Sequence, residues 1–240
     1  MQQYFTDKSI TLNQPIILSN EQVHHISNVM RMVENDDILI SDETAIYYCS
    51  LRFFQKQPTA VAYKIYDHNS EHLFKINLYM ALIKTDKWEF MLQKASELGV
   101  CKIIPVITTR TIVKLNDNIT KKLDRWHKIA QEACEQAHRI KRVIISEPVK
   151  LTDIPFEKDK LNIIAYENEA ANHIGNIQID KDVNIIVGPE GGFSDNEVNT
   201  LVKLGYQPCS LGARILRAET AALYALSIIG LGSDKIIWKK

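Results

Sequence analysis

The chain has 240 residues, of which 45% are hydrophobic and 24% are charged, a composition ordinary for a globular protein with a substantial core. Its formal net charge is zero, so bulk charge identifies no partner. Four widely spaced cysteines without a CxxC pair favour buried, reduced thiols over a disulfide framework or a zinc knuckle (Cys49, Cys101, Cys134, Cys209).

Targeting signals are missing from the sequence pattern. The first ten residues, MQQYFTDKSI, do not have the basic-then-apolar layout of a signal peptide. No apolar run approaches the roughly 18 residues that span a bilayer. The predicted location is therefore cytoplasmic.

Charge is distributed unevenly along the chain. Residues 1–72 have a net charge of −4, residues 73–150 carry 15 Lys and Arg against 8 Asp and Glu, and residues 151–240 have a net charge of −3. The middle third predicts either a basic face for a polyanion or a solvated surface with scattered lysines, and composition does not choose between them.

The N-terminal region, residues 1–70, is predicted to be a small β-barrel domain. YYCSLRFF and TAVAYKIY are short, aromatic and β-branched, as half-buried strands are. SNEQVHHISNVMRM lies between earlier strand-like pieces and predicts one covering helix. The polar, aperiodic DHNSEH that follows is typical of a linker.

Residues 73–240 predict an α/β domain with a mostly parallel sheet, because strands and helices alternate. FKINLYMALI, KIIPVIT, LNIIAYE, VNIIV and QPCSL are the expected strands. Helices are expected over DKWEFMLQKASELGV, with Gly99 as its stop, and over residues 120–139. Another begins with a capping box formed by Ser194 and Glu197, and the last is AETAALYALSIIG.

Two loops that follow strands carry the clearest site signals, since ligands of open α/β sheets bind at the carboxyl ends of strands. GPEGGFS has three glycines for close backbone approach but a carboxylate, Glu190, where a phosphate cradle has a lysine. This loop suits a cationic or amine-bearing ligand such as S-adenosylmethionine, or is a tight turn with Glu190 in solvent. LGARILR presents Arg214 and Arg217 to an anionic ligand or a developing negative charge.

Several segments together resemble one family. VGPEGGFSDNE, LGARILRAETA, KTDKWEFMLQKASELGV with TTR after it, RWHKIAQEACEQAHR and HHISNVMRM run in order along almost the whole chain. They are similar to the RsmE family of ribosomal RNA uracil-N3-methyltransferases, in the SPOUT superfamily. Thr85 and Trp88 stand where that family has glycine and methionine. The segment RIKRVII, which begins at Arg139, does not have the family's usual proline.

The resemblance implies a PUA-like, RNA-binding barrel and a knotted α/β methyltransferase domain that dimerises and holds S-adenosylmethionine. It implies methylation of N3 of the uracil at position 1498 of 16S ribosomal RNA, in the assembled 30S subunit. The residues that it assigns to the cofactor are Tyr166, Glu167, Gly188, Pro189, Glu190, Gly191, Leu211, Gly212, Ile215 and Leu216.

Catalysis at a uracil nitrogen requires that its proton be removed and the resulting anion be stabilised. Arg217 is the candidate for stabilising the anion, and Glu190 or Glu219 for accepting the proton. The candidates for binding RNA are Arg31, Arg110, Lys114, Arg139, Lys141 and Arg142. No metal ligand set is expected, because His68 and His72 lie in the polar linker and no HExxH motif is present.

Other classes of protein remain open at this point. One is a knotted methyltransferase that acts on transfer RNA or on another ribosomal site. A second is a cofactor-binding protein without turnover, and a third is a purely RNA-binding module built on the barrel. The complete GPEGG and RILRAET segments favour a working pocket over the last two.

Overall fold

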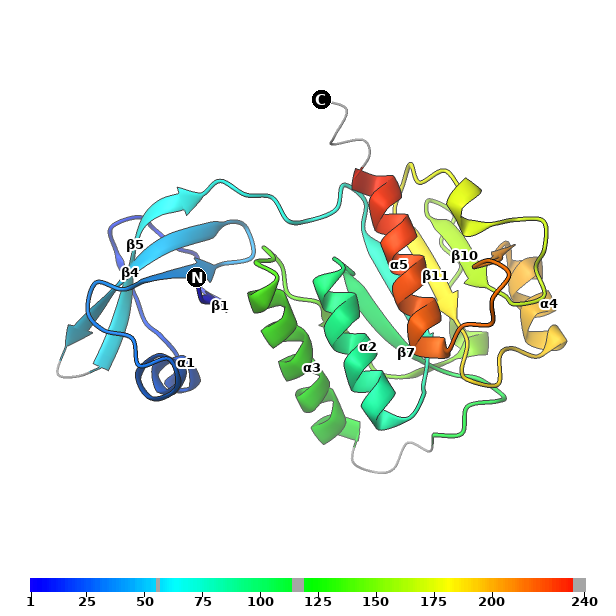
Figure 1. Cartoon of the computed structure of the whole chain (residues 1–240), viewed down its shortest axis with the longest axis horizontal. Helices are drawn as coiled ribbons and strands as arrows, with labels where there is room; N and C mark the ends of the chain where they lie inside the picture. The colour runs from blue at the N-terminus through cyan, green and yellow to red at the C-terminus, as the bar shows by residue number, and fades with distance from the viewer. Residues whose placement is uncertain (55–56, 114–118, 235–240) are drawn as a thin grey trace. The chain divides into compact units, whose positions relative to one another are not determined.

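The computed structural model describes residues 1–54, 57–113 and 119–234. It divides into two compact units (Figure 1). The first consists of residues 1–71 and 134–142, and the second of residues 72–133 and 143–240. A short segment from the middle of the sequence therefore belongs to the N-terminal unit, a return of the chain that the sequence pattern did not predict.

The first unit contains a five-stranded sheet in the order β1-β3-β4-β5-β2. Its strands are β1 (Gln3–Phe5), β2 (Pro15–Ile16), β3 (Asp37–Ser41), β4 (Ile46–Phe54) and β5 (Gln57–Tyr66). All its pairs are antiparallel except β1 with β3. Inward side chains such as Ile38, Ile40 and Leu51 form the core together with Ile26 from the covering helix.

The covering helix differs from the single helix that the sequence predicted. It begins with α1 (Asn20–His24), where Ser19 and Gln22 form a capping box, and continues as a π-helical turn, η1 (His25–Val29). Arg31 then takes a φ of 53°, in the left-handed region, which ends the helix before the MRM residues that were expected to continue it.

The second unit is built on a parallel sheet whose strand order is β12-β10-β11-β6-β7-β8, with β9 also paired to β7. Its strands are β6 (Ile76–Ala81), β7 (Lys102–Ile107), β8 (Ile144–Ile145), β9 (Val149–Lys150), β10 (Leu161–Ala165), β11 (Val183–Val187) and β12 (Gln207–Cys209). Every residue of β6 and β11 is buried, in agreement with the continuous apolar runs of the sequence.

Four helices accompany this sheet: α2 (Thr85–Glu97), α3 (Ile119–Gln136), α4 (Asp195–Leu204) and α5 (Ala218–Asp234). Helices α2 and α5 pack against each other (Figure 1). The predicted apolar stripe of α2 is buried at Trp88, Met91, Leu92 and Ala95, and Gly99 with a φ of 83° follows its end. The predicted α/β fold is confirmed, whereas the knot that the resemblance implies stays a prediction.

Candidate functional site

Three loops at the carboxyl edge of the parallel sheet enclose one cavity of about 870 Å³. They follow β10, β11 and β12, which are neighbours in the sheet. Sites for small molecules have volumes of this order, and the edge is where parallel sheets bind ligands. All ten residues that the resemblance assigned to a cofactor line this cavity.

The GPEGG segment after β11 forms a tight turn. The Gly192 N–H donates to the Pro189 carbonyl at 2.9 Å, which closes a β-turn with Glu190 and Gly191 at its centre. Gly192 has a φ of 66°, and a Cβ at this position would collide with the Glu167 carboxylate. Glycine is therefore favoured at residue 192 by the backbone conformation, and a Cβ there would also require the Glu167 side chain to move.

The loop after β10 contributes Tyr166, Glu167, Glu169 and His173 to the cavity. The Tyr166 N–H donates to the Cys209 carbonyl at 2.9 Å, and its hydroxyl donates to Asp195 Oδ1 at 2.9 Å. The backbone of Tyr166 is thereby linked to β12, and its ring, at the cavity wall, is linked to the first turn of α4. Of these four residues, Tyr166 and Glu167 were predicted from the sequence.

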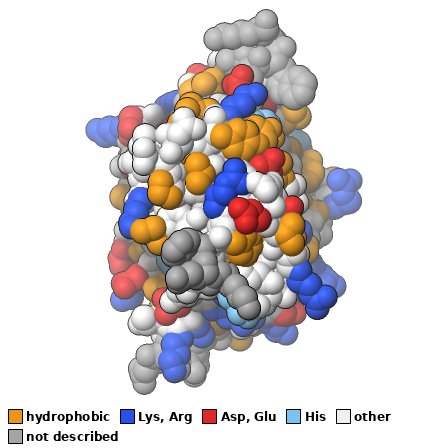
Figure 2. Space-filling view, turned by 90° about the vertical axis from the view of Figure 1, so that its left-hand side faces the viewer, with side chains coloured by type: hydrophobic (Ala, Val, Ile, Leu, Met, Phe, Trp, Pro, Cys, Tyr) orange, Lys and Arg blue, Asp and Glu red, His pale blue; other side chains and the backbone are white. Residues whose placement is uncertain are grey.

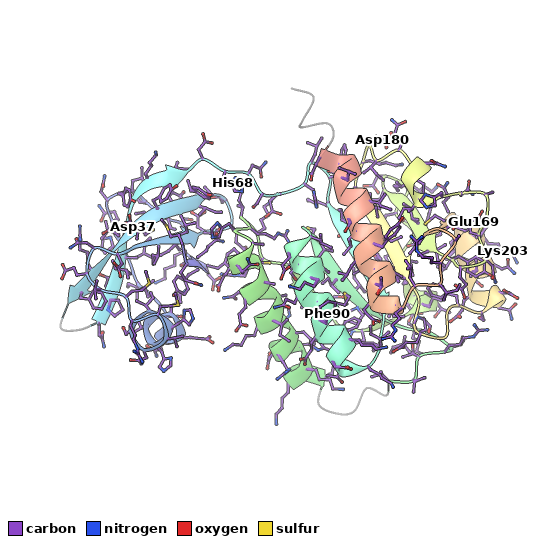
Figure 3. All side chains as sticks on the ribbon, in the orientation of Figure 1. Asp37, His68, Phe90, Glu169, Asp180 and Lys203 are labelled. Atoms are coloured by element: carbon purple, nitrogen blue, oxygen red, sulfur yellow. The ribbon has the colours of Figure 1, made fainter. Side chains whose placement is uncertain are left out.

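Glu169 and His173 are cavity residues that the sequence analysis missed. Glu169 Oε1 accepts the N–H groups of Ala171 at 2.6 Å and Asn172 at 3.0 Å, which shapes the loop on which Glu169 is labelled in Figure 3. His173 Nδ1 accepts the Gly175 N–H at 3.1 Å. Their position soon after a strand that ends at the cavity is the signal that could have identified them.

The LGARILR loop after β12 forms the remaining wall. Gly212 has a φ of 105°, and its N–H donates to Ser210 Oγ at 3.1 Å. Ile215 is 86% exposed and lines the cavity together with Leu211 and Leu216, which gives this wall an apolar surface. Arg214 and Arg217 are both exposed and both line the cavity.

Helix α4 follows the GPEGG turn in the chain and begins at Asp195, after the predicted capping box at Ser194. Ser194 Oγ accepts the Glu197 N–H, and Glu197 Oε2 accepts the Ser194 N–H at 2.8 Å. Burial opposes ionisation of Glu197, but hydrogen bonds from the Thr109 N–H and from Ser194 outweigh it and lower the pKa of its carboxyl. Glu197 therefore joins the loop after β7 to the start of α4.

The cysteine at the end of β12, next to the cavity loops, is not a reactive thiol. Cys209 is fully buried at the end of β12, and burial raises the pKa of its thiol to about 12. A thiol that stays protonated is neither a nucleophile nor a metal ligand. The described residues also hold no group of three or more His, Cys, Asp or Glu side chains able to bind a metal ion.

Glu190 and Arg217, two of the three predicted catalytic residues, line the cavity, whereas Glu219 does not. The Glu219 side chain is 12% exposed on α5, and its Oε1 lies 3.9 Å from Lys87 Nζ. The structure therefore brings Glu190 and Arg217 together at the cavity and gives Glu219 a neighbouring lysine on α2. The position of Glu219 just after RILR in the sequence did not reveal this difference.

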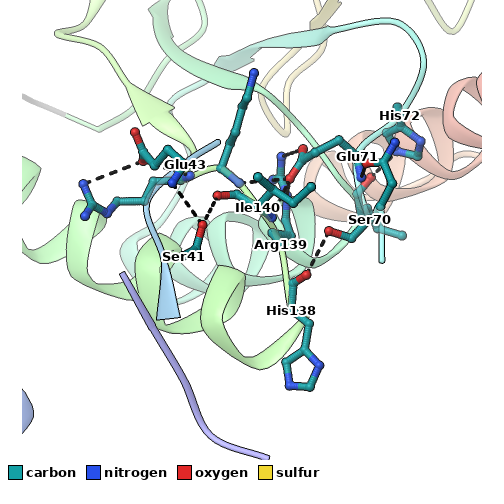
Figure 4. A network of polar contacts seen from close by, with 12 residues as sticks. Ser41, Glu43, Ser70, Glu71, His72, His138, Arg139 and Ile140 are labelled. Atoms are coloured by element: carbon teal, nitrogen blue, oxygen red, sulfur yellow. Dashed lines mark hydrogen bonds and ion pairs between the residues drawn. The ribbon is translucent and has the colours of Figure 1, made fainter. Parts of the chain in front are cut away.

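Arg139 requires a correction, because it is buried and not available to RNA. Its side chain is 2% exposed, and its Nη2 donates to Glu71 Oε2 at 2.7 Å (Figure 4). Glu71 Oε1 also accepts the backbone N–H groups of Ile140 and Lys141. A buried arginine paired in this way holds the returning segment of residues 134–142 within the first unit.

The other predicted RNA contacts fall into different environments. Arg142 donates from Nη1 to Asp7 Oδ1 at 2.7 Å and lies over the Phe5 ring, so its side chain contacts the first unit at the surface. Arg31 and Lys141 are exposed. Lys114 lies outside the described residues. On the face drawn in Figure 2, acidic and basic side chains are interspersed with apolar ones.

Arg110 is exposed but contacts the protein and not only solvent. Its Nη1 donates to the carbonyl oxygens of Gly191 at 2.7 Å and Phe193 at 3.1 Å.

Within the part of the chain that the structure describes, no helix is long and apolar enough to cross a membrane.

Comparison with known proteins identifies the family. Residues 69–230 match the family described as an RNA methyltransferase domain. The ribosomal RNA small subunit methyltransferase E of Bacillus subtilis is 35% identical, over 98% of this chain and 98% of its own. The chain belongs to the ribosomal RNA small subunit methyltransferase E family.

Solved structures of similar proteins agree with this assignment. The enzyme of that name from Neisseria gonorrhoeae, bound to S-adenosyl methionine, has a TM-score of 0.86 and 30% identity, over 95% of each chain. A methyltransferase structure from Legionella pneumophila in complex with the same cofactor also has a TM-score of 0.86, with 32% identity over 95% of this chain and 96% of that one. Both domains of the predicted fold thus have counterparts in one family.

Proposed function

We propose that the protein transfers a methyl group from S-adenosylmethionine to N3 of a uracil, at position 1498, in the 16S ribosomal RNA of the small subunit. The observation that carries this proposal is the cavity at the carboxyl ends of β10, β11 and β12, which all ten residues expected at the cofactor line. Membership of the small subunit methyltransferase E family supplies the class of RNA.

The residues present fit S-adenosylmethionine by their chemistry. Glu167, Glu169 and Glu190 bring carboxylates to the cavity, which suits a ligand with a sulfonium and an ammonium group and opposes a phosphate ligand. Leu211, Leu216 and the exposed Ile215 provide apolar surface for a purine ring. When bound, this cofactor supplies the methyl group carried by its positively charged sulfur.

Backbone conformation supports the same ligand. Gly188 packs against Phe193, where a Cβ would lie 2.9 Å from the ring, and Gly192 packs against Glu167. The glycines therefore let the turn lie close to neighbouring side chains while its backbone faces the cavity. A ligand held largely by backbone groups is recognised by shape, since those groups cannot rearrange as side chains do.

Arg217 and Glu190 are the proposed catalytic residues. A uracil N3 carries a proton that must leave as the new nitrogen–carbon bond forms. The Arg217 guanidinium stabilises the negative charge that develops on the uracil, and the exposed Glu190 carboxylate accepts the proton. Glu190 is preferred to Glu219 because Glu190 lines the cavity and Glu219 lies beside Lys87 on α2.

RNA binding is proposed for the first unit and for exposed basic side chains. Arg31 and Lys141 are exposed, and Arg142 pairs at the surface with the exposed Asp7, so these three are the proposed contacts, whereas Arg139 is buried in its pair with Glu71. We also propose that the enzyme works as a homodimer in the cytoplasm, where assembled 30S subunits are its substrate. The affinity for RNA is expected to fall with added salt as phosphate contacts are screened.

The decisive experiment is transfer of a labelled methyl group from S-adenosylmethionine to 30S subunits that lack the modification. Deproteinised 16S RNA and transfer RNA serve as matched acceptors. The expected result is label at N3 of one uracil in the 30S subunit and little in transfer RNA. Measurable cofactor binding without label on any ribosomal acceptor would contradict the proposed substrate.

A further inference from the structure

Arg110 connects the loop after β7 to the GPEGG turn. Its Nη1 donates to the carbonyl oxygens of Gly191 and Phe193, at 2.7 and 3.1 Å. Beside it, the Thr109 N–H donates to Glu197 Oε1 at 2.8 Å. Two consecutive residues of one loop therefore hold the turn and the helix that follows it.

The conformation of the turn leaves two carbonyl oxygens available to donors outside it. Gly192 has a φ of 66°, and the backbone passes through it between the Gly191 and Phe193 carbonyls. Neither carbonyl belongs to a strand or lies within α4, so a side-chain donor or water can bond to each. Arg110 donates to both, and its stem covers Gly191, where a Cβ would lie 3.5 Å from Arg110 Cβ.

We propose that Arg110 is a positioning residue for the cofactor cavity. Through its hydrogen bonds to the turn, Arg110 holds Glu190 and Gly191 in the arrangement that binds S-adenosylmethionine. The inference rests on the proposed function and deepens it. Arg110 is not among the residues that line the cavity, so it acts through the turn and not by touching the ligand. The sequence pattern had assigned this arginine to RNA.

The expected size of the effect follows from populations. Hydrogen bonds from a guanidinium are stronger than neutral ones, but exposure of Arg110 to water reduces their net contribution. Without them the turn adopts several arrangements, and the apparent affinity falls with the fraction that remains competent. If about one-tenth of the molecules keep the binding arrangement, the dissociation constant rises about tenfold.

The test is calorimetric binding of S-adenosylmethionine to Arg110→Ala and Arg110→Lys. Arg110→Ala is expected to bind about tenfold more weakly and Arg110→Lys less than about threefold, because an ammonium group can donate to both carbonyls. Millimolar guanidinium ion is expected to restore part of the affinity of Arg110→Ala and leave wild type unchanged. Faster hydrogen exchange at the amides of residues 191–193 is expected in the alanine variant.

Lys141→Ala is the matched control, since Lys141 is an exposed basic residue of the other unit that was predicted for RNA as well. It is expected to bind the cofactor as wild type does. Wild-type cofactor affinity in Arg110→Ala would overturn the proposal, whether or not binding to 30S subunits is lost. If Arg110→Ala does not fold, Arg110→Met keeps the stem beside Gly191 but has no N–H donor, and its wild-type affinity together with wild-type exchange at residues 191–193 would overturn the proposal.

The proposed function fails by a different result. Wild-type protein that binds S-adenosylmethionine but methylates no uracil in the 30S subunit contradicts the substrate and leaves the role of Arg110 standing. Wild-type protein that does not bind the cofactor contradicts both. The binding and the transfer measurements therefore separate the two proposals.

Discussion

The two ends of the parallel sheet in the second unit differ in the environment of their polar side chains, which are buried at one end and exposed at the other. Near the amino ends, Asn77, Asn184 and Asn162 stand in register on three neighbouring strands and are buried. Asn77 Nδ2 donates to Asn184 Oδ1 at 2.9 Å, and Asn184 Nδ2 donates to Asn162 Oδ1 at 2.9 Å and to Glu157 Oε2 at 2.8 Å. The polar groups of this end are satisfied within the protein.

At the carboxyl ends, the same strands run into loops whose polar groups face a cavity. Glu190 and Arg217 are exposed there, and Ile215 is among the most exposed apolar residues of the described chain. A buried amide ladder specifies strand register, because each unpaired amide would cost free energy. Exposed groups at the other end are available to a ligand. The difference assigns stability to one end of the sheet and binding to the other.

The largest expected effect is at the cavity end. Arg217→Ala is expected to lower the rate of methyl transfer by about 10²–10³-fold, since it removes a positive charge that stabilises the developing uracil anion. The affinity for S-adenosylmethionine, measured by calorimetry, is expected to change by less than about threefold. Lys203→Ala, which removes an exposed positive charge on α4 outside the cavity, is the control. Unchanged turnover in Arg217→Ala would remove Arg217 from the mechanism.

The second largest effect is expected on stability, from a substitution at the amino end of the sheet. Asn184→Ala leaves Asn77, Asn162 and Glu157 without their shared partner and is expected to lower the free energy of unfolding by about 2–4 kcal/mol. Cofactor affinity measured well below the melting temperature is expected to stay at its wild-type value. Denaturant unfolding provides the measurement, with Asn199→Ala on the exposed side of α4 as the control. A weaker cofactor affinity in folded Asn184→Ala would show that the two ends are coupled.

A smaller effect is expected from the turn itself. Gly192→Ala forces an L-residue into the left-handed region and places a Cβ against the Glu167 carboxylate, so a loss of about 1–2 kcal/mol in unfolding free energy is expected. Gly191→Ala has ordinary contact distances and no positive φ, and its stability is expected to stay within about 0.5 kcal/mol. Equal stability of the two variants in thermal unfolding would contradict the strained turn.

The smallest effect concerns pH at the amino end. A hydrogen bond from Lys160 lowers the pKa of Glu157, with burial opposing and Asn184 assisting. Because the folded pKa lies below the ordinary value of 4.5, the ionised carboxylate stabilises the fold above that pH, and this contribution is lost as the pH falls through the folded pKa. The difference in melting temperature between wild type and Glu157→Gln is expected to shrink below about pH 4.5. A difference that grows on acidification would reverse the assigned sign.

Much of this comparison could be predicted from sequence. The buried apolar runs of β6, β10 and β11, the amphipathic pattern of α2 and the capping box of Ser194 and Glu197 are local patterns, and the structure confirms them. The loops after β11 and β12 were selected by their position after strands, and they meet the loop after β10 at one cavity. Residues such as His173 and Glu169 were missed because neither has a local motif.

The arginines show where prediction stopped. Arg110, Arg139 and Arg142 belong to the basic middle third and were assigned alike to RNA, yet they serve a turn, a buried ion pair and an exposed acidic neighbour. A charged residue in a sequence indicates that its side chain will interact with a polar or oppositely charged group, but the sequence does not identify that group. The partner of Arg139 is Glu71, 68 residues away, and that of Arg110 is the carbonyl of Gly191, 81 residues away.

The sequence by itself determined the main strands and helices of the second unit, because strand periodicity, helix caps and glycine turns depend on residues within a few positions of one another. It also determined the family, through motifs that are continuous in the chain. Only the tertiary structure decided which polar groups are satisfied inside the protein and which are left for a ligand. That outcome depends on packing between distant segments, since a buried charge or carbonyl takes whatever partner the fold places within hydrogen-bonding distance.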